Sequence, residues 1–383
     1  MTKILVLGAG MVGSVIAADL AADRGTKVTV ADCSRGALAR ARERARGRII
    51  CVEADGSDAR SVRTLAEKAD FVVGALPGRL GFRCLESVIQ AGRSGVDISF
   101  MPEDFLELAP LARRRGVTVV ADCGVAPGMS NMLAAWGAAR LTRPSRLLIM
   151  VGGLPRERRW PFEYKAPFSP ADVIEEYVRP ARVVRGGRVV VREALSEPEL
   201  VAMPGVGTVE SFLTDGLRSL AHTLRIPEME ERTLRYPGHI HLMRVFRELG
   251  LFSETPVDVG GVPVVPLHLT SKLLFPRWTY QPDEHDLTVM RVEVEGLLRR
   301  KPTRLAWDLH DVQDPATGFS SMARTTGFPA AAVLRLVRRG RIRRRGVLAP
   351  EHVATEPGVL DAVLRDLAAR GVRFEARVEQ LAA

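Results

Sequence analysis

The sequence predicts an α/β protein, in which a doubly wound parallel sheet of the Rossmann type precedes a mixed α+β domain for substrate binding and dimerisation. Three observations lead to this prediction. Residues 3–8 (KILVLG) form a short apolar strand directly before a G-x-G-x-x-G motif. Strand and helix patterns then alternate as far as residue 121. After residue 128 the alternation stops, and Gly186-Gly187 between two apolar runs indicates an antiparallel hairpin.

The glycine motif opens a helix, and each of its glycines has a separate purpose. Gly8 allows the tight turn, Gly10 lets the backbone approach a pyrophosphate, and Gly13 lets the helix pack closely on the strand. Met11 and Val12 lie in the first helical turn, where backbone N–H groups and the positive end of the helix dipole attract phosphate. We therefore expect a dinucleotide at this turn.

A second strand over residues 27–31 ends at Asp32, about 20 residues after the motif. A carboxylate at this position binds the ribose hydroxyls of NAD and repels the 2′-phosphate of NADP. Arg35 lies close by and is the residue that would instead favour NADP. The sequence predicts NAD as the cofactor.

The alternation predicts a right-handed, parallel arrangement. The expected helices and strands are helices 37–46, 58–67, 82–91 and 102–115, and strands 49–53, 70–75, 95–99 and 117–121. Ligands of such sheets lie beyond the carboxyl ends of the strands. This rule adds further cofactor-binding candidates, namely Asp55, Ala75, Leu76, Pro77, Ser99, Asp122 and Gly128. For Asp55 and its neighbour Ser57, capping of the next helix is an equal alternative.

The second half of the chain mixes helices with strands that pair as a meander. The expected elements are helices 130–140, 170–177 and 208–224, and strands 146–152, 181–185, 188–192, 233–235 and 288–296. A strong helical pattern returns at Ser320, and we expect it to pack on the nucleotide domain. The predicted domains are residues 1–123 for the dinucleotide, 124–318 for substrate and oligomerisation, and 319–383 as a returning segment.

Composition points away from several other classes of protein. There is no stretch of 18 uncharged apolar residues, which predicts no membrane span, and the four cysteines show no metal spacing, which favours a reduced cytoplasmic protein without a metal site. His285 lies among acids, which we interpret as a solvated turn. The net charge of +10 comes mainly from scattered arginines, and only residues 338–345 form a dense run, interpreted as a solvated helix end. We expect no nucleic-acid partner.

Several stretches together resemble the saccharopine dehydrogenase-like family. They are GAGMVG at the start, DCGVAPGMSN at 122–131, FSPADVIEEYVRPA at 168–181, TLRYPGH at 233–239 and MARTTGFP at 322–329. VGGLP at 151–155 and RPARV make the branch of NAD-dependent lysine 6-dehydrogenases the most similar. The resemblance implies a homodimeric or larger two-domain amine dehydrogenase. In that branch the ε-amine of lysine becomes an imine by hydride transfer to the nicotinamide, and water then releases ammonia to leave a semialdehyde.

Amine oxidation by hydride transfer needs a base, because only the neutral amine loses hydride. His239 in YPGH is the first candidate, and a capping or core-edge histidine is the alternative. Tyr236 is a candidate donor to the substrate, or else a buried structural tyrosine. Asp172, Glu175 and Glu176 are candidates to hold the cationic amine or to act as the base, although acids in early helical turns also suit the helix dipole.

An amino-acid substrate also needs an anion site for its carboxylate, which the fork of an arginine binds best. Arg235 and Arg324 are the candidates, with Thr325 beside the latter. Two other functions stay open. One is a saccharopine- or carboxynorspermidine-type reductase that acts on a secondary amine, and the other is a non-catalytic NAD-binding regulator.

Overall fold

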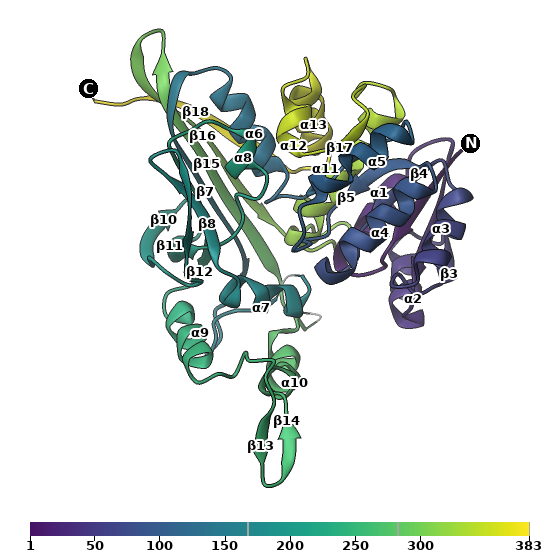
Figure 1. The fold of residues 1–383 in the computed structure, drawn as a ribbon, viewed down its shortest axis with the longest axis horizontal. Helices are drawn as coiled ribbons and strands as arrows, with labels where there is room; N and C mark the ends of the chain where they lie inside the picture. Colours follow the sequence, from purple (N-terminus) through teal and green to yellow (C-terminus); the bar gives the residue numbers. More distant parts are fainter. Residues whose placement is uncertain (167, 282, 383) are drawn as a thin grey trace. The chain divides into compact units, whose positions relative to one another are not determined.

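The computed structural model describes residues 1–166, 168–281 and 283–382, and these form two compact units (Figure 1). The first unit comprises Met1–Arg140, Pro315–Phe319 and Ala323–Arg373. The second comprises Leu141–Asp314, Ser320–Met322 and the C-terminal residues from Phe374. Among the described residues, none of the helices combines the length and the apolar composition needed to cross a membrane.

The first unit contains a seven-stranded sheet in the order β17-β6-β5-β4-β1-β2-β3, in which every neighbouring pair is parallel. The strands are β1 (Thr2–Leu7), β2 (Thr26–Asp32), β3 (Ile49–Glu53), β4 (Phe71–Gly74), β5 (Ser94–Asp97), β6 (Thr118–Val120) and β17 (Gly346–Leu348). Apart from the added β17, this is the strand order of a doubly wound dinucleotide-binding sheet. The predicted fold class is confirmed.

Helices enclose this sheet because its strands are apolar on both faces. They are α1 (Met11–Ala21), α2 (Arg35–Arg44), α3 (Ala59–Glu67), α4 (Gly78–Gln90), the short 3₁₀ turn η1 (Phe105–Leu108), α5 (Ala109–Arg114), α6 (Met129–Ala138), α11 (Ser321–Arg338), α12 (Pro350–Ala354) and α13 (Val359–Ala368). On one face, Leu5 and Leu7 pack with Val62 of α3 and Val88 of α4. These core contacts position the strand ends that carry the candidate cofactor residues.

Two predicted domain limits differ from the units observed. The first unit ends at Arg140 and not at residue 123, because α6 packs on α12 within that unit. The predicted segment 319–383 also divides, since β18 (Phe374–Gln380) pairs with β16 (Lys301–Val312) in the sheet of the second unit. Residue 383 of that segment lies outside the described residues. The helix predicted from Ser320 is α11, and most of it belongs to the first unit, as expected.

A buried arginine joins α11 to α1 and α13. The Arg335 side chain is 6% exposed and donates to Asp19 at 2.7 Å, to Asp23 at 2.9 Å and to Asp366 at 3.1 Å. These carboxylates compensate for the loss of water around the guanidinium and raise its pKa above the ordinary value. The cluster therefore holds three helices of the first unit together.

We predict that Arg335→Ala lowers the free energy of unfolding by about 3 kcal/mol, because it removes the cation that Asp19, Asp23 and Asp366 share and leaves only Arg370 close to Asp19 and Asp366. Urea denaturation followed by circular dichroism measures the change. Arg339→Ala, on an exposed neighbouring side chain, is the control and should change stability by less than about 0.5 kcal/mol. Equal effects of the two substitutions would contradict the structural role of Arg335.

The second unit contains a mixed sheet with the main order β10-β11-β12-β7-β15-β16-β18, and the β8–β9 hairpin joins it at β12. The strands not yet bounded are β7 (Thr142–Pro155), β8 (Ala181–Arg185), β9 (Arg188–Arg192), β10 (Glu199–Met203), β11 (Gly207–Leu213), β12 (Glu228–Arg235) and β15 (Asp286–Leu298). The remaining elements are α7 (Pro170–Val178), α8 (Leu220–Thr223), α9 (His239–Glu248), α10 (Pro266–Trp278), and the small hairpin of β13 (Val257–Val259) and β14 (Val262–Val264).

The hairpin predicted at Gly186-Gly187 is present, with φ of +56° and +75° at the two glycines. The helix predicted over 208–224 is wrong, because most of its first half is strand β11 and only α8 is helical. Val209, Ser211 and Leu213 are buried along β11, so the sheet, and not local helix propensity, decides the conformation there.

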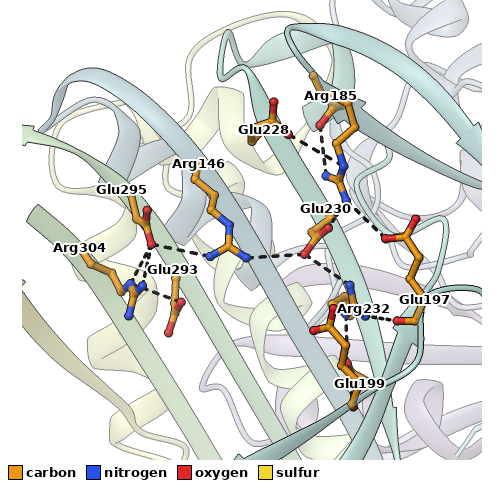
Figure 2. Close-up of polar contacts among 12 residues, drawn as sticks. Arg146, Arg185, Glu197, Glu199, Glu228, Glu230, Arg232, Glu293, Glu295 and Arg304 are labelled. Carbon is orange, nitrogen blue, oxygen red and sulfur yellow. Dashed lines mark hydrogen bonds and ion pairs between the residues drawn. The ribbon is translucent and has the colours of Figure 1, made fainter. Parts of the chain in front are cut away.

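Charged side chains connect six strands on one face of the second unit's sheet, namely β7, β8, β10, β12, β15 and β16 (Figure 2). Arg146 on β7 lies 3.8 Å from both Glu230 on β12 and Glu295 on β15, and Arg304 on β16 donates to Glu295 at 2.7 Å. Arg232 on β12 contacts Glu199 on β10 at 3.6 Å. Each arginine drawn in Figure 2 therefore has at least one carboxylate partner, and the pairs link adjacent strands into one network.

The turn before β15, predicted to be solvated, contains one buried carboxylate. Asp286 is 2% exposed and accepts hydrogen bonds from the backbone N–H groups of Ser321 at 2.6 Å and Met322 at 2.9 Å. Asp286 thus caps the start of α11 from a neighbouring strand, which compensates for its burial. His285 contacts Gln313 at 3.0 Å.

Candidate functional site

The glycine turn of the first unit has the geometry that its sequence predicts. Gly8 has φ of +105°, and a Cβ at this position would collide with the carbonyl oxygen of Ala75. A Cβ on Gly13 would collide with the carbonyl of Gly8, whereas nothing lies within 4 Å of the corresponding position on Gly10. Gly8 and Gly13 are thus required by the fold, and the open space beside Gly10 suits the close approach of a ligand.

Asp32 links this turn to the end of β2 through hydrogen bonds. Its carboxylate accepts the N–H of Ala9 at 2.7 Å and the N–H of Ser34 at 2.7 Å. No side chain among the described residues caps α1 at Gly10, so the N–H groups of Met11 and Val12 remain available at the helix start. These donors and the empty space at Gly10 fit the pyrophosphate of a dinucleotide.

Arg35, the residue that would favour NADP, is directed to another partner. Its Nε donates to Glu53 at 2.6 Å, and its side chain is 85% exposed. Binding of a 2′-phosphate there would have to compete with Glu53 and approach the carboxylate of Asp32.

Asp55 closes a turn and does not cap a helix. Its Oδ1 accepts the N–H and the hydroxyl of Ser57, both at 2.8 Å, and these hydrogen bonds lower the pKa of Asp55. The cap of α3 is Asp58, which accepts the N–H of Arg60 at 2.9 Å. The capping alternative for Asp55 and Ser57 is therefore wrong, and any contact of Asp55 with adenine stays a prediction.

The segment after β4 lies beside the glycine turn. The N–H of Ala75 donates to the carbonyl of Leu7 at 2.8 Å, which extends the pairing of β4 and β1 by one residue. Leu76 packs beside Gly56, where a Cβ would lie 2.7 Å from a Leu76 methyl, and Pro77 directly precedes α4. All three residues thus lie at the predicted carboxyl edge of the sheet.

Asp97 is a functional candidate that the sequence reasoning missed. It is 2% exposed at the end of β5, and its Oδ1 accepts the N–H of Ser99 at 2.7 Å. Burial raises the pKa of Asp97 to about 7. A predicted strand over 95–99 placed Asp97 inside the strand, whereas β5 ends at Asp97. With that boundary, the rule that ligands lie at strand ends would have selected Asp97.

The loop from Asp122 to Gly128 is held by buried polar groups. Asp122 is 1% exposed with φ of +52°, and Gly128 has φ of +136°. The N–H of Gly128 donates to Asn131 at 3.2 Å, and the amide of Asn131 donates to Glu351 of α12 at 3.2 Å. Cys123 is fully buried, and burial raises the pKa of its thiol, so it is a space-filling residue and not an activated nucleophile.

In the second unit, the ends of β12, α7 and α9 bring His239, Tyr177 and Arg235 together. His239 Nε2 lies 2.9 Å from the hydroxyl of Tyr177, and its Nδ1 lies 2.9 Å from the carbonyl oxygen of Phe162. Because a carbonyl only accepts, Nδ1 carries the hydrogen and Nε2 accepts from Tyr177. Both ring nitrogens of His239 are thus engaged inside the unit, which favours the alternative of a structural histidine.

Arg235 is 2% exposed, and its buried charge is paired with Glu176. Its Nε donates to Tyr177 at 3.2 Å, and its guanidinium carbon lies 4.5 Å from the centre of the Tyr164 ring. Burial raises the pKa of Glu176, while the charge of Arg235 opposes that shift. Arg235 and Glu176, which were predicted separately as carboxylate and amine ligands, therefore form an ion pair beside the aromatic cluster.

Two further aromatic residues bring unpartnered donors to this cluster. Trp278 is fully buried, its ring centre lies 6.3 Å from that of His239, and its Nε1 has no partner among the described residues. The buried hydroxyl of Tyr280 likewise has no partner within the described part of the chain. Buried donors without acceptors are rare in folded proteins, so both groups, like the Tyr164 hydroxyl that also lacks a partner within the described residues, are candidates to donate to a ligand. The sequence analysis missed both, because lone aromatic residues carry no motif.

The remaining predicted residues do not join this cluster. Glu175 is exposed and pairs with Arg179 at 3.2 Å, and Asp172 lies in the first turn of α7. The hydroxyl of Tyr236 donates to the carbonyl of Pro155 at 3.0 Å, within a different apolar cluster. Arg324 and Thr325 belong to the first unit, where Arg324 donates to the carbonyl of Arg370 at 2.6 Å.

Strand order and glycine turn together define a dinucleotide-binding α/β protein with a second, mixed-sheet domain. Family models for the saccharopine dehydrogenase NADP binding domain and the saccharopine dehydrogenase C-terminal domain match residues 4–120 and 124–372 respectively. The chain belongs to the saccharopine dehydrogenase family.

Similar proteins agree with this membership. Mitochondrial alpha-aminoadipic semialdehyde synthase of Mus musculus is 24% identical over 91% of this chain, although the chain covers only 45% of that protein. Saccharopine dehydrogenase (NADP+, L-glutamate-forming) of Saccharomyces cerevisiae is 23% identical over 95% of this chain and 96% of its own. The apo structure of the L-Glu forming saccharopine dehydrogenase from that yeast aligns with a TM-score of 0.81 at 18% identity, covering 99% of this chain and 100% of that one. A homospermidine synthase from Legionella pneumophila aligns at 0.66 and 11% identity, covering 99% and 91%.

We predict that His239 makes the second unit sensitive to acid. Burial, together with the charge of Arg235, lowers its pKa from 6.5 to about 3. The unfolded histidine binds a proton below pH 6.5 while the folded one does not, so stability is lost as the pH falls. Between pH 7.5 and pH 5 this loss is about 2 kcal/mol.

The measurement is urea unfolding of the wild type and His239→Gln at both pH values. The substitution should remove most of that pH-dependent loss. His241→Gln, on an exposed side chain of the same helix, should leave it unchanged. A loss of the same size in His239→Gln and the wild type would show that His239 is already protonated or exposed in the folded protein.

Proposed function

We propose that the protein is an NAD-dependent dehydrogenase that oxidises the ε-amine of L-lysine to the semialdehyde and releases ammonia. Membership of the saccharopine dehydrogenase family supports an oxidoreductase of lysine-derived amines. Asp32 at the end of β2 and the pairing of Arg35 with Glu53 support NAD over NADP. A bound nicotinamide would supply the hydride acceptance.

The observation that carries the substrate class is the buried pair of Arg235 and Glu176. An α-amino acid bears a carboxylate and an ammonium on the same carbon, and this pair offers the opposite charges side by side. The guanidinium has five N–H donors, of which three are used by Tyr177, Leu234 and Glu176. The α-carboxylate would take the remaining donors, and the α-ammonium would lie against Glu176.

This anchoring assigns different roles to the predicted residues. Glu176 binds the α-ammonium in this arrangement, whereas the sequence offered Glu175, Glu176 and Asp172 for the ε-amine or as the base. Glu175 is exposed and is not part of the arrangement. His239 acts as a positioning residue, since it holds the Tyr177 hydroxyl that in turn receives the Nε–H of Arg235. The unpartnered donors of Trp278 and Tyr280 would complete the hydrogen bonds of the carboxylate.

The second candidate function is oxidation of the secondary amine of saccharopine, which the names of the yeast relatives favour. Saccharopine contains a lysine moiety, so the pair of Arg235 and Glu176 would serve its α-amino acid end equally well. Saccharopine needs additional cationic groups for its other carboxylates, and a substrate comparison separates the two functions.

We predict that Asp32→Asn shifts the cofactor preference. The amide keeps an acceptor for the N–H of Ala9 but removes the charge that repels a 2′-phosphate. The ratio of kcat/KM for NAD to that for NADP should fall at least about tenfold, or about 1.4 kcal/mol. Asp58→Asn removes a charge from the same edge and should leave the ratio unchanged. A wild type that already prefers NADP would overturn the assignment of NAD.

We predict that the protein forms NADH with L-lysine, and that Glu176→Gln and Arg235→Lys weaken substrate binding in different ways. Glu176→Gln should raise KM for L-lysine at least about tenfold, because it removes the charge facing the α-ammonium. It should affect 6-aminohexanoate, which lacks the α-amine, much less. Arg235→Lys should weaken the binding of both substrates, because both carry the carboxylate.

Glu175→Gln decides between the two neighbouring glutamates. If Glu175→Gln greatly raises the KM for L-lysine while Glu176→Gln has little effect, Glu175 and not Glu176 is the substrate-binding glutamate. Saccharopine-dependent NADH without lysine activity would select the second candidate function. NAD binding without turnover of any of these amines would favour the non-catalytic regulator.

A further inference from the structure

The amino edge of the parallel sheet collects exposed cations from separate parts of the chain. Because all seven strands are parallel, the loops that lead into them meet at one edge. Arg113–Arg115 precede β6 and Arg343–Arg345 precede β17, its hydrogen-bonded neighbour, and all six side chains are exposed. These two loops are 228 residues apart in sequence, taken between Arg115 and Arg343, yet enter adjacent strands.

The same pattern continues to the other end of the sheet. Exposed basic residues lie at the start of the three strands at that end: Arg24 precedes β2, Arg46 and Arg48 precede β3, and Lys3 and Lys27 are the second residues of β1 and β2. We use the name basic edge for these five residues together with the two arginine triplets. Its members lie at β6 and β17 at one end of the sheet and at β1, β2 and β3 at the other, and none of them lies at β4 or β5.

The cations of the basic edge are not used in ion pairs. No carboxylate oxygen lies within 4.0 Å of the triplets Arg113–Arg115 and Arg343–Arg345 among the described residues of the chain. By contrast, the arginines labelled in Figure 2, on the sheet of the second unit, each contact glutamate. Arginine abundance alone therefore does not explain this edge, since other arginines of the same chain are neutralised.

The opposite edge of the same sheet carries the reverse charge. Its strand ends bear Asp32, Glu53, Asp55, Asp97 and Asp122. The helix dipole accounts for Arg113 and Arg114, which lie in the last turn of α5. It does not account for Arg343–Arg345, which lie beyond α11 and lead into a strand. The first unit thus separates a candidate cofactor edge from a positive edge.

The dimensions and residue types of the basic edge indicate which kind of anion it would bind. The seven strands span six spacings of about 4.8 Å, so the two groups of cations lie at the two ends of a distance of about 29 Å, which corresponds to roughly eight base pairs of duplex. Nine of its eleven residues are arginine, whose planar fork binds phosphate in a bidentate manner. No aromatic residue is a member, which argues against stacking on single-stranded bases.

We propose that the basic edge binds the phosphate backbone of double-stranded nucleic acid without sequence preference, as an activity separate from that of the cofactor edge. The sequence analysis expected no such partner because its arginines are scattered along the chain. The fold brings nine of these arginines to one edge of the first unit's sheet, and a basic face of this kind is what nucleic-acid binding requires.

The test uses the full chain and a fluorescein-labelled 20-base-pair DNA of random sequence, with anisotropy measured from 50 to 300 mM KCl. The triple variant Arg114→Glu, Arg343→Glu, Arg344→Glu should bind at least about tenfold more weakly at 100 mM KCl. Its slope of log K against log salt should be smaller in magnitude by about 2.7, which is 0.9 for each lost phosphate contact. NADH formation or NAD binding should be unchanged, so failure here is distinguishable from failure of the proposed enzyme function.

The matched control is Arg40→Glu, Arg60→Glu, Arg83→Glu, which makes the same change of charge on exposed helical residues of the same unit. Equal weakening by control and test variants would show that only net charge matters, and would overturn the proposal. So would single-stranded DNA that binds as tightly as the duplex. Binding to vesicles of phosphatidylcholine with 30% phosphatidylserine, without binding to duplex, would also overturn it and assign the edge to a membrane surface.

Discussion

The parallel pairing of the seven-stranded sheet is the constraint on which the first unit depends. Parallel strands place every residue that follows a strand at one edge and every residue that precedes a strand at the other. Asp32, Asp97 and the glycine turn therefore meet although they are distant in sequence. The same rule gathers the arginine triplets at the far edge. One hydrogen-bonding pattern thus creates two surfaces of opposite charge.

The second unit depends on a different kind of constraint, the burial of charge. Arg235 loses nearly all contact with water, and the carboxylate of Glu176, the Leu234 carbonyl and the surrounding rings compensate for that loss. His239 stays neutral beside this cation, because burial and the charge of Arg235 both lower its pKa. A site assembled in this way discriminates strongly between ligands, since any ligand must replace the hydrogen bonds that water no longer supplies.

Differences between expectation and structure follow from the same physics. Sequence spacing identified both Glu175 and Glu176, but only packing decides which carboxylate turns towards Arg235, because neighbouring helical residues point in directions about 100° apart. The predicted helix over 208–224 became β11, because hydrogen bonds to β10 and β12 outweigh local propensity. Asp97 was missed because the strand predicted over 95–99 ended two residues later than β5 does.

The sequence by itself determined the Rossmann sheet, the roles of Gly8 and Gly13, the hairpin at Gly186-Gly187 and the family resemblance. These features rest on local backbone requirements and short periodic patterns, which a few adjacent residues express completely. Only the tertiary structure decided the partners of His239, the exposure of Glu175, the crossing of β18 into the second sheet and the gathering of the basic edge. Each of these depends on residues far apart in the chain, and no local pattern records which of them become neighbours.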